Sequence, residues 1–261
     1  MILVDTHCHL QDVKFAEDRE DTIDRTLGAL AWCVVIGDDL ASSQAGLDVT
    51  REGIYAAVGV HPYYPQEIDD AGIAALRELA RHDRVVAIGE IGLDYHMGGE
   101  DVPAQHAAFS RQLQLASELK LPVVIHSRDA AEDTVAILTE HRSRLSGVVM
   151  HCFSGDAAFA EQCIALDCYI SFAGNVSFPK AEPLRDAARV VPANRLLVET
   201  DAPYLAPQPR RGKRCEPAYV QYTLEAIATA RGDDPGMLAA QTTENAHRFF
   251  GVSSTVNRLV N

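Results

Sequence analysis

The sequence has 261 residues, of which 47% are hydrophobic and 23% charged, a composition that suits a folded globular protein and excludes an intrinsically disordered one. The formal net charge of −14 excludes a protein held to nucleic acid or anionic lipid by its overall field, and leaves room only for a local basic patch. No apolar stretch approaches the ~20 residues that cross a bilayer. The six cysteines form no CxxC pair, so we expect reduced thiols and a reducing compartment. Asp5 interrupts the apolar start of the chain, so we expect no targeting segment and a cytoplasmic location.

Short runs rich in Val and Ile recur along the chain and alternate with longer segments of helical period. The runs are 2–9, 32–37, 54–61, 85–94, 121–127, 147–153, 168–174 and 195–201. The clearest helical segments are 73–82, 105–120, 132–138, 159–166, about 217–231 and 235–249. Continuous apolar runs are typical of parallel strands that are buried on both faces.

Strand and helix repeated about eight times over this length predict an α/β fold, a (β/α)8 TIM barrel that occupies residues 1–261 as a single domain. The alternative is a doubly wound open sheet. The absence of a Gly-rich loop after the first strand counts against that alternative.

Ionisable side chains stand at the ends of six of the eight predicted strands. They are His7 and His9, then His61, Glu90 with Asp94, His126, His151, and Glu199 with Asp201. In a barrel the carboxyl ends of all strands open at one mouth, where the active sites of this fold lie. We therefore expect these side chains to meet in one place.

His7 and His9 are two residues apart on one strand, so both imidazoles point to the same side. Neutral imidazoles with carboxylates opposite them are typical ligands of a divalent metal. The predicted ligands are His7, His9, Glu90, His126, His151 and Asp201. Because one catalytic metal usually takes three protein ligands, this set fits two metals bridged by Glu90. The predicted cofactor is one or two divalent cations, Zn²⁺, Mn²⁺ or Mg²⁺.

A single histidine at a strand end is more often a hydrogen-bonded core residue than a ligand, so the metal prediction depends on the whole set. His61 precedes Pro62 and is expected to contact the ligands or the substrate rather than the metal, with a structural role as the alternative. Asp94 and Tyr95 either shape the mouth or reach the metal.

Six motifs in chain order resemble those of the TatD-type metal-dependent deoxyribonucleases of the amidohydrolase superfamily. They are VDTHCHL, GVHP, GEIGLDYH, LPVVIHSRDA, MHCFSG and ETDAPYL. The resemblance runs from residue 2 to about residue 217. It implies a TIM barrel with one or two divalent cations that hydrolyses phosphodiester bonds, often as a 3′-exonuclease, and it implies that the six predicted ligands are the metal ligands.

The chain departs from that family pattern at one position. Cys215, in RGKRCEP, stands where the family usually has Asn, so a carboxamide is replaced by a weakly bonding thiol and the substrate contacts near this residue are in question. Many members of the superfamily bridge their metals with a carbamylated lysine. The fourth predicted strand carries Glu90 and no lysine, so we expect no modified lysine here.

The segment PQPRRGKR, residues 207–214, places four cations directly after the last predicted strand. Loops after strands seven and eight of a barrel commonly bind phosphate, and the guanidinium group matches phosphate oxygens. We therefore expect Arg211 and Lys213 to bind the substrate, DNA or another phosphodiester. The alternative is a solvated loop. No membrane and no obligate protein partner are expected.

In the predicted mechanism the metals lower the pKa of a water molecule, and Asp201 orients this water and takes its proton, while Glu90 bridges the metals. Two other functions stay open. One is an amidohydrolase that acts on a carbonyl or ring C–N bond, which the basic segment and the missing lysine disfavour. The other is a metal or nucleic-acid binder without catalysis, which a complete ligand set disfavours.

Overall fold

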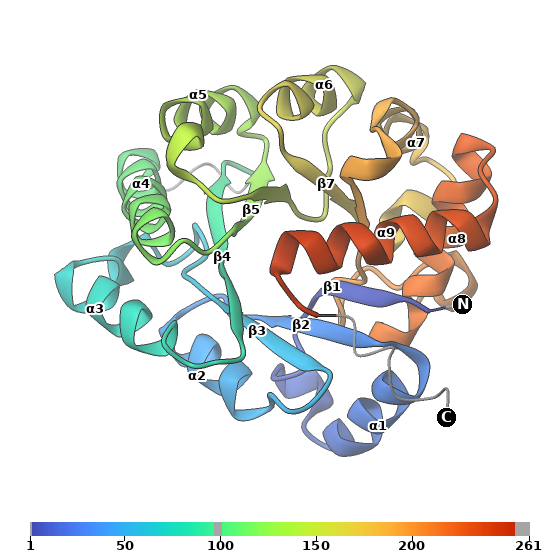
Figure 1. The fold of residues 1–261 in the computed structure, drawn as a ribbon, viewed down its shortest axis with the longest axis horizontal. Coiled ribbons are helices and arrows are strands. Elements are labelled where there is room, and N and C mark those ends of the chain that lie inside the picture. The colour runs from blue at the N-terminus through green and yellow to red at the C-terminus, as the bar shows by residue number, and fades with distance from the viewer. Residues whose placement is uncertain (1, 97–100, 254–261) are drawn as a thin grey trace.

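The computed structural model describes residues 2–96 and 101–253. Eight parallel strands form one sheet in sequence order, and its first and last strands meet, so that the sheet nearly closes into a barrel (Figure 1). The strands are β1 Val4–Cys8, β2 Trp32–Ile36, β3 Ile54–Val58, β4 Val85–Asp94, β5 Val123–Arg128, β6 Val148–Met150, β7 Tyr169–Phe172 and β8 Leu196–Val198. The predicted TIM barrel is confirmed, and the doubly wound open sheet is wrong because neighbours in this sheet follow the chain order.

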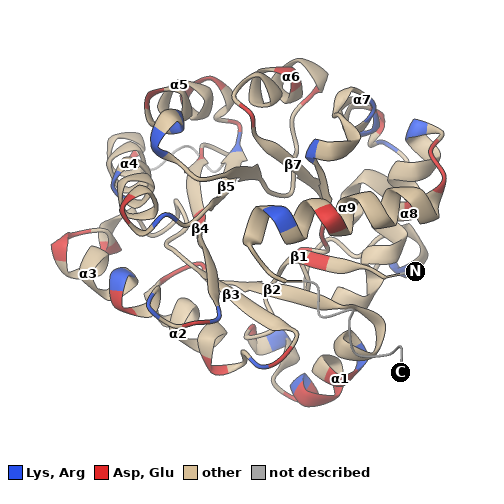
Figure 2. Ribbon diagram, viewed as in Figure 1, with Lys and Arg blue, Asp and Glu red and all other residues tan. Residues whose placement is uncertain are grey.

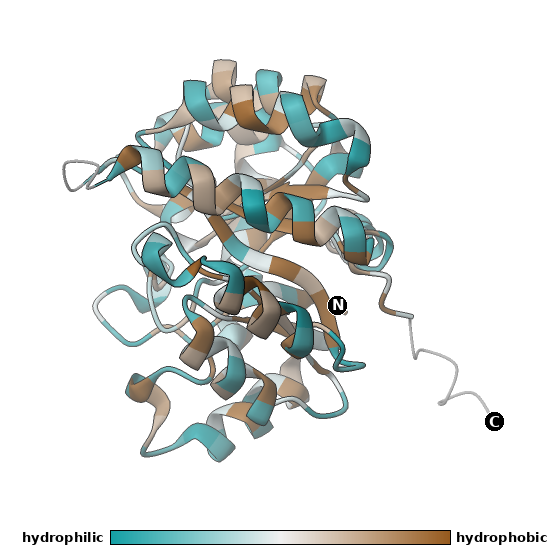
Figure 3. Cartoon of the chain, turned by 90° about the vertical axis from the view of Figure 1, so that its left-hand side faces the viewer, coloured by the Kyte–Doolittle hydropathy of each residue, from teal (hydrophilic) through white to brown (hydrophobic). Residues whose placement is uncertain are grey.

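Helices cover the sheet: all but the last lie around its outer face, and the last lies across one end of the barrel (Figure 1). They are α1 Arg19–Ala29, α2 Leu40–Asp48, α3 Asp70–Leu79, α4 Val102–Leu119, α5 Ala131–His141, α6 Ala157–Ala165, α7 Glu182–Val190, α8 Val220–Arg231 and α9 Pro235–Phe250. The strands at the centre are mainly hydrophobic, whereas the helices mix hydrophobic and hydrophilic residues (Figure 3). Acidic and basic residues are interspersed over these helices in the view of Figure 2. Among the described helices, none has both the length and the apolar character of a membrane span.

Three helices, α1, α2 and α7, have no counterpart among the predicted helical segments. Their buried positions are occupied mainly by small or polar residues, Thr22, Thr26, Ser43, Gly46, Ala187 and Ala188 among them. In α1 and α2 such faces give only a weak apolar periodicity, which is the signal that sequence analysis uses. Helix α7 is strongly amphipathic, so its absence from the predicted segments has no such explanation.

Aspartate side chains begin five of the helices. In each case the carboxylate accepts a hydrogen bond from a backbone N–H of the first turn, which would otherwise lack a partner. These N-cap residues are Asp39, Asp69, Asp101, Asp156 and Asp234. Part of the acidic composition therefore serves to start helices.

The join between β1 and β8 is made by few backbone contacts. Asp201 N donates to His7 O at 2.9 Å and His9 N donates to Ala202 O at 2.7 Å. The buried carboxylate of Asp5 strengthens the join, since it accepts from the Thr200 hydroxyl at 2.5 Å and from the Thr200 backbone N–H at 2.9 Å. At this join, side-chain hydrogen bonds therefore add to the few backbone hydrogen bonds between the two strands.

Helix α9 covers the end of the barrel at which the strands begin, and it crosses the view of Figure 1 in red. Phe249 packs against Tyr169 of β7, with ring centroids 5.2 Å apart. Asn245 donates to the carbonyl oxygens of Ala193 and Leu196 at 2.7 and 2.9 Å. This end of the barrel is therefore closed by side chains, which leaves the opposite end for a site.

We predict that Phe249→Ala lowers the free energy of unfolding by about 3 kcal/mol, because a large buried ring is removed from the barrel floor. The neighbouring Arg248→Ala, which removes an exposed side chain, should change it by less than about 0.5 kcal/mol. Urea unfolding followed by circular dichroism measures both. Equal effects of the two variants would contradict the role given to α9.

Candidate metal centre

The six predicted ligands lie together at the end of the barrel where the strands finish. His7 belongs to β1, Glu90 to β4 and His126 to β5. His9 and His151 follow β1 and β6 directly, and Asp201 is the third residue after β8. Two groups among them, His7 with His9 and Asp201, and His7 with Glu90 and His151, have ligand atoms that all lie within 4.8 Å of one another. Two further groups of the same kind include residues outside the predicted set, since His61 joins Glu90 and His126, and Asp38 joins His9 and Glu90. A cavity of about 680 Å³ opens over them.

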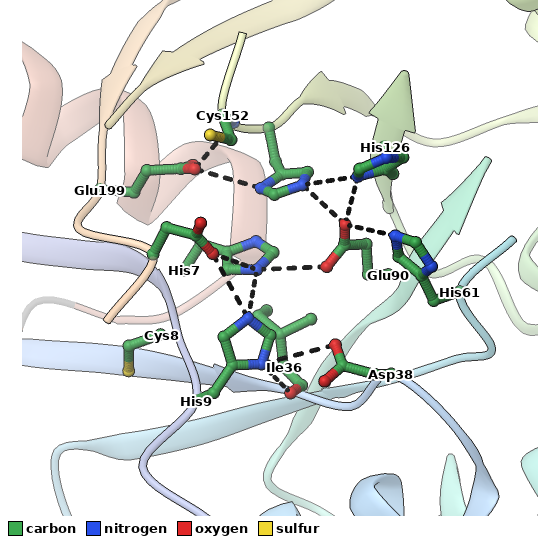
Figure 4. A network of polar contacts seen from close by, with 12 residues as sticks. His7, Cys8, His9, Ile36, Asp38, His61, Glu90, His126, Cys152 and Glu199 are labelled. Atoms are coloured by element: carbon green, nitrogen blue, oxygen red, sulfur yellow. Dashed lines mark hydrogen bonds and ion pairs between the residues drawn. The ribbon is translucent and has the colours of Figure 1, made fainter. Parts of the chain in front are cut away.

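Glu90 occupies the middle of this cluster (Figure 4). One carboxylate oxygen, Oε1, lies 2.7 Å from His126 Nδ1 and 2.8 Å from His151 Nε2, while the other, Oε2, lies 3.4 Å from His7 Nε2. The carboxylate therefore faces one histidine group with each oxygen, as a bridging ligand would. Burial opposes ionisation of Glu90, but the surrounding histidines outweigh it and hold its pKa well below the usual value.

Three of the four histidines have their proton fixed on the nitrogen that points away from the cluster. His9 Nδ1 donates to Ile36 O at 3.0 Å, His126 Nε2 to Asp94 Oδ2 at 2.8 Å, and His151 Nδ1 to Glu199 Oε1 at 3.2 Å. With its outward nitrogen bonded in this way, each ring presents its inward nitrogen to the cluster, where this nitrogen can bind a cation once it has lost its proton. Metal-binding histidines are oriented by such acceptors in the same way.

His7 and His9 bring their Nε2 atoms within 3.2 Å of each other, with Asp201 Oδ1 3.7 Å from the first and 3.4 Å from the second. His7 Nδ1 has no hydrogen-bond partner among the described residues, so the tautomer of His7 is not fixed, and two Nε2 atoms this close need a proton or a cation between them. Burial lowers the pKa of His9, but Asp38 and Asp201 overcome it and raise this pKa to about 10. The cluster thus favours positive charge, and its nitrogen and carboxylate donors fit a divalent cation.

His61 differs from these four in its hydrogen bonding. Its Nδ1 accepts the backbone N–H of Tyr63 at 3.1 Å, so its Nε2 carries the proton and points this N–H toward Glu90 Oε1 at 3.6 Å. Burial lowers the pKa of His61 to about 3, which keeps the ring neutral. The structure thus places His61 against a predicted ligand and in the wall of the cavity, while its predicted contact with substrate stays a prediction.

Glu199, which is expected at the mouth, is joined there by three residues that received no role from the sequence. Asp38 follows β2 and lies 3.5 Å from His9 Nδ1, and Glu199 accepts from His151 and from Cys152 N at 2.7 Å. Arg128 and Asn175 line the cavity, and the buried Oδ1 of Asn175 has no hydrogen-bond partner among the described residues. Each stands at or just after the end of a strand, which is the signal that could have identified it.

The basic segment after β8 lies outside the residues that line the metal cavity. The guanidinium carbon of Arg211 lies 3.8 Å from the centre of the Phe178 ring. Arg214 donates to both carboxylate oxygens of Asp18. Cys215, at the position where the family usually has Asn, is fully buried in the core. The substitution therefore changes core packing, and the side chain of Cys215 does not face the mouth.

A family model described as TatD related DNase matches residues 4–251. The chain belongs to this family. The match confirms the predicted family and the predicted class of enzyme, a metal-dependent hydrolase that acts on phosphodiester bonds.

Individual proteins agree with this membership. The chain is 40% identical to an uncharacterized metal-dependent hydrolase, YabD, of Bacillus subtilis, over 97% of this chain and 100% of that protein. It is 37% identical to the 3′-5′ ssDNA/RNA exonuclease TatD of Erwinia tasmaniensis, over 96% of this chain and 100% of that protein. The crystal structure of YJJV, a TatD homologue from Escherichia coli, superposes with a TM-score of 0.88 at 28% identity, over 96% of this chain and 98% of that one.

We predict that Asp94→Asn weakens the affinity for a divalent cation by about 10–100-fold, because His126 loses the carboxylate that orients its ring. Asp129→Asn is the matched control, since Asp129 pairs with the exposed His96 outside the cluster. Competition with a metal-binding dye measures both affinities. If the two variants bind metal equally well, Asp94 does not support the site.

Proposed function

We propose that this protein binds two divalent cations through His7, His9, Glu90, His126, His151 and Asp201 and hydrolyses phosphodiester bonds of single-stranded nucleic acid as an exonuclease. The observation that carries the proposal is the convergence of inward histidine nitrogens and the Asp201 carboxylate around Glu90, in a cavity at the barrel mouth. Divalent cations bound there would withdraw charge from the phosphoryl oxygens and make a water molecule more acidic. Zn²⁺, Mn²⁺ and Mg²⁺ are the candidates, and the proposed location is the cytoplasm.

Asp201 is proposed to orient the attacking water and to accept its proton. Its carboxylate lies at the edge of the cluster, 3.4 Å from His9 Nε2, and borders the cavity. Burial would raise its pKa, but His9 and His7 overcome this effect and lower it, so the group is ionised and able to take a proton. Glu90 is enclosed by histidines and is assigned to holding the cations.

The cavity supports a phosphate ester more than an amide or a ring C–N bond. Arg128 lines it and offers a guanidinium group for phosphoryl oxygens. Asn175 offers a carboxamide whose oxygen has no partner among the described residues. On this basis the phosphodiesterase is favoured over the amidohydrolase, and a screen of bis-p-nitrophenyl phosphate, single-stranded DNA, RNA, an ester and an amide tests the choice.

We predict that Glu90→Gln reduces kcat/KM for bis-p-nitrophenyl phosphate by more than about 100-fold and lowers the metal content, because a carboxamide cannot bridge two cations as a carboxylate does. His61→Asn should cost less, about 10–100-fold, since His61 acts through Glu90. Steady-state kinetics and elemental analysis measure both variants. Equal losses would mean that the roles of Glu90 and His61 are wrongly assigned.

We predict that Arg211→Ala with Lys213→Ala raises KM for single-stranded DNA and makes it less dependent on salt. Each cation that no longer binds a phosphate should remove roughly 0.7 from the slope of log K against log salt. Hydrolysis of a small phosphodiester should change much less, because it has one phosphate. An equal loss of activity with both substrates would show that the segment shapes the metal centre instead.

A further inference from the structure

The mouth of the barrel carries its charges unevenly. On the side of α5 and α6, a second cavity of about 500 Å³ adjoins the metal cavity, because Ser127 and Ser154 line both. Its described lining residues include four carboxylates and neither Lys nor Arg. The carboxylates are Asp129, Glu132, Asp133 and Asp156. A phosphate chain that left the metal cavity on this side would meet charges of its own sign.

The side of the mouth where β1 and β8 end is built differently. Tyr204 lines the metal cavity, is 42% exposed, and has its ring centroid 6.1 Å from that of His9. Its hydroxyl donates to Asp12 Oδ2 at 2.9 Å, and Lys14 Nζ lies 3.9 Å from the centre of its ring. These contacts hold an ammonium group over one face of an aromatic ring at the edge of the cavity.

The ammonium group of Lys14 is available to a ligand. Among the residues that the structure describes, it forms no ion pair. The nearby carboxylate of Asp12 is already occupied, since one oxygen accepts from the Tyr204 hydroxyl and the other from the backbone N–H of Lys14 at 2.7 Å. The ammonium group of Lys14 is therefore positioned by a cation–π contact with Tyr204 and not by an ion pair with a carboxylate.

The loop after β8 continues this side of the mouth. Arg214 Nη1 donates to Lys14 O at 2.8 Å, which ties the loop to the turn that carries Lys14. Arg214 itself is paired with Asp18, whereas Arg211 and Lys213 form no ion pair within the described segments. The turn that carries Lys14 and the loop that carries Arg211 and Lys213 are thus in contact, and none of these three cations has an acidic partner among the described residues.

We propose that a single-stranded nucleic acid with one phosphate at the metal centre extends across Tyr204 and Lys14 toward Arg211 and Lys213, and not over the acidic cavity between α5 and α6. This inference rests on the proposed function. A partly exposed aromatic ring close to unpaired cations suits a single strand of any sequence, because a base can stack on the ring face that Lys14 leaves open while phosphates contact the cations. Lys14 and Tyr204 bind the nucleotides beside the reacting phosphate and take no part in the chemistry.

The test measures the binding of phosphorothioate dT10 and dT2 to the metal-loaded enzyme by fluorescence anisotropy over a range of salt. Lys14→Gln should weaken dT10 binding by about 3–10-fold and reduce the salt slope by roughly 0.7, with a smaller effect on dT2. Tyr204→Ala should weaken dT10 more than Tyr204→Phe, which keeps the ring and loses only the bond to Asp12.

Two variants serve as controls. Arg144→Gln removes an exposed arginine at the opposite end of the barrel, before β6, and should leave both binding and slope unchanged. Glu132→Gln, at the acidic cavity, should bind dT10 at least as tightly as the wild type.

Several outcomes would overturn the inference. It fails if Lys14→Gln binds dT10 like the wild type, or if Glu132→Gln weakens that binding. A wild-type enzyme that hydrolyses bis-p-nitrophenyl phosphate but binds no dT10 would overturn the path and leave the phosphodiesterase intact. Hydrolysis of neither bis-p-nitrophenyl phosphate nor DNA with any metal would overturn the proposed function as well.

Discussion

The join between β1 and β8 determines whether the metal ligands meet. His7 and His9 lie on one side of it and Asp201 on the other, and the backbone hydrogen bonds that close it involve these same three residues. The buried carboxylate of Asp5 holds Thr200 beside them through two bonds. Burial raises the pKa of Asp5 well above its usual value, and the bonds from Thr200 partly offset this effect. The hydrogen bonds that close the barrel therefore also bring His7 and His9 next to Asp201.

The orientation of the histidines depends on the same sheet. His9 is oriented by the carbonyl of Ile36 in β2, His126 by Asp94 in β4, and His151 by Glu199 directly after β8. Each acceptor comes from a strand other than the one that carries the ring. A change in strand register would therefore break the hydrogen bonds that orient the imidazole rings as well as displace the side chains. The fold thus determines which ring nitrogen faces the cluster as well as where each ring lies.

The sequence predicted the barrel and the meeting of the six candidate ligands because both depend on local patterns, apolar runs and polar residues at their ends. It could not assign the tautomer of His61, which depends on a backbone N–H two residues later. It also gave no role to Asp38 or Asn175, since an acidic or amide residue after a strand is common in loops. The side chain of Arg211 is oriented by Phe178 and that of Arg214 by Asp18. Neither partner is close in sequence, so local patterns could not indicate these contacts.

The Asp5–Thr200 clamp spans 195 residues of sequence. At the usual speed of protein synthesis, about 5–20 residues per second, β1 waits roughly 10–40 s on the ribosome before β8 exists to pair with it. During that time the free edge of β1 has unpaired backbone groups, and Val4 and Cys8 lack the neighbours that bury them in the finished barrel. Nascent chains of this protein are therefore expected to depend on chaperones until translation has passed β8, even though β1 and β8 meet in the finished barrel.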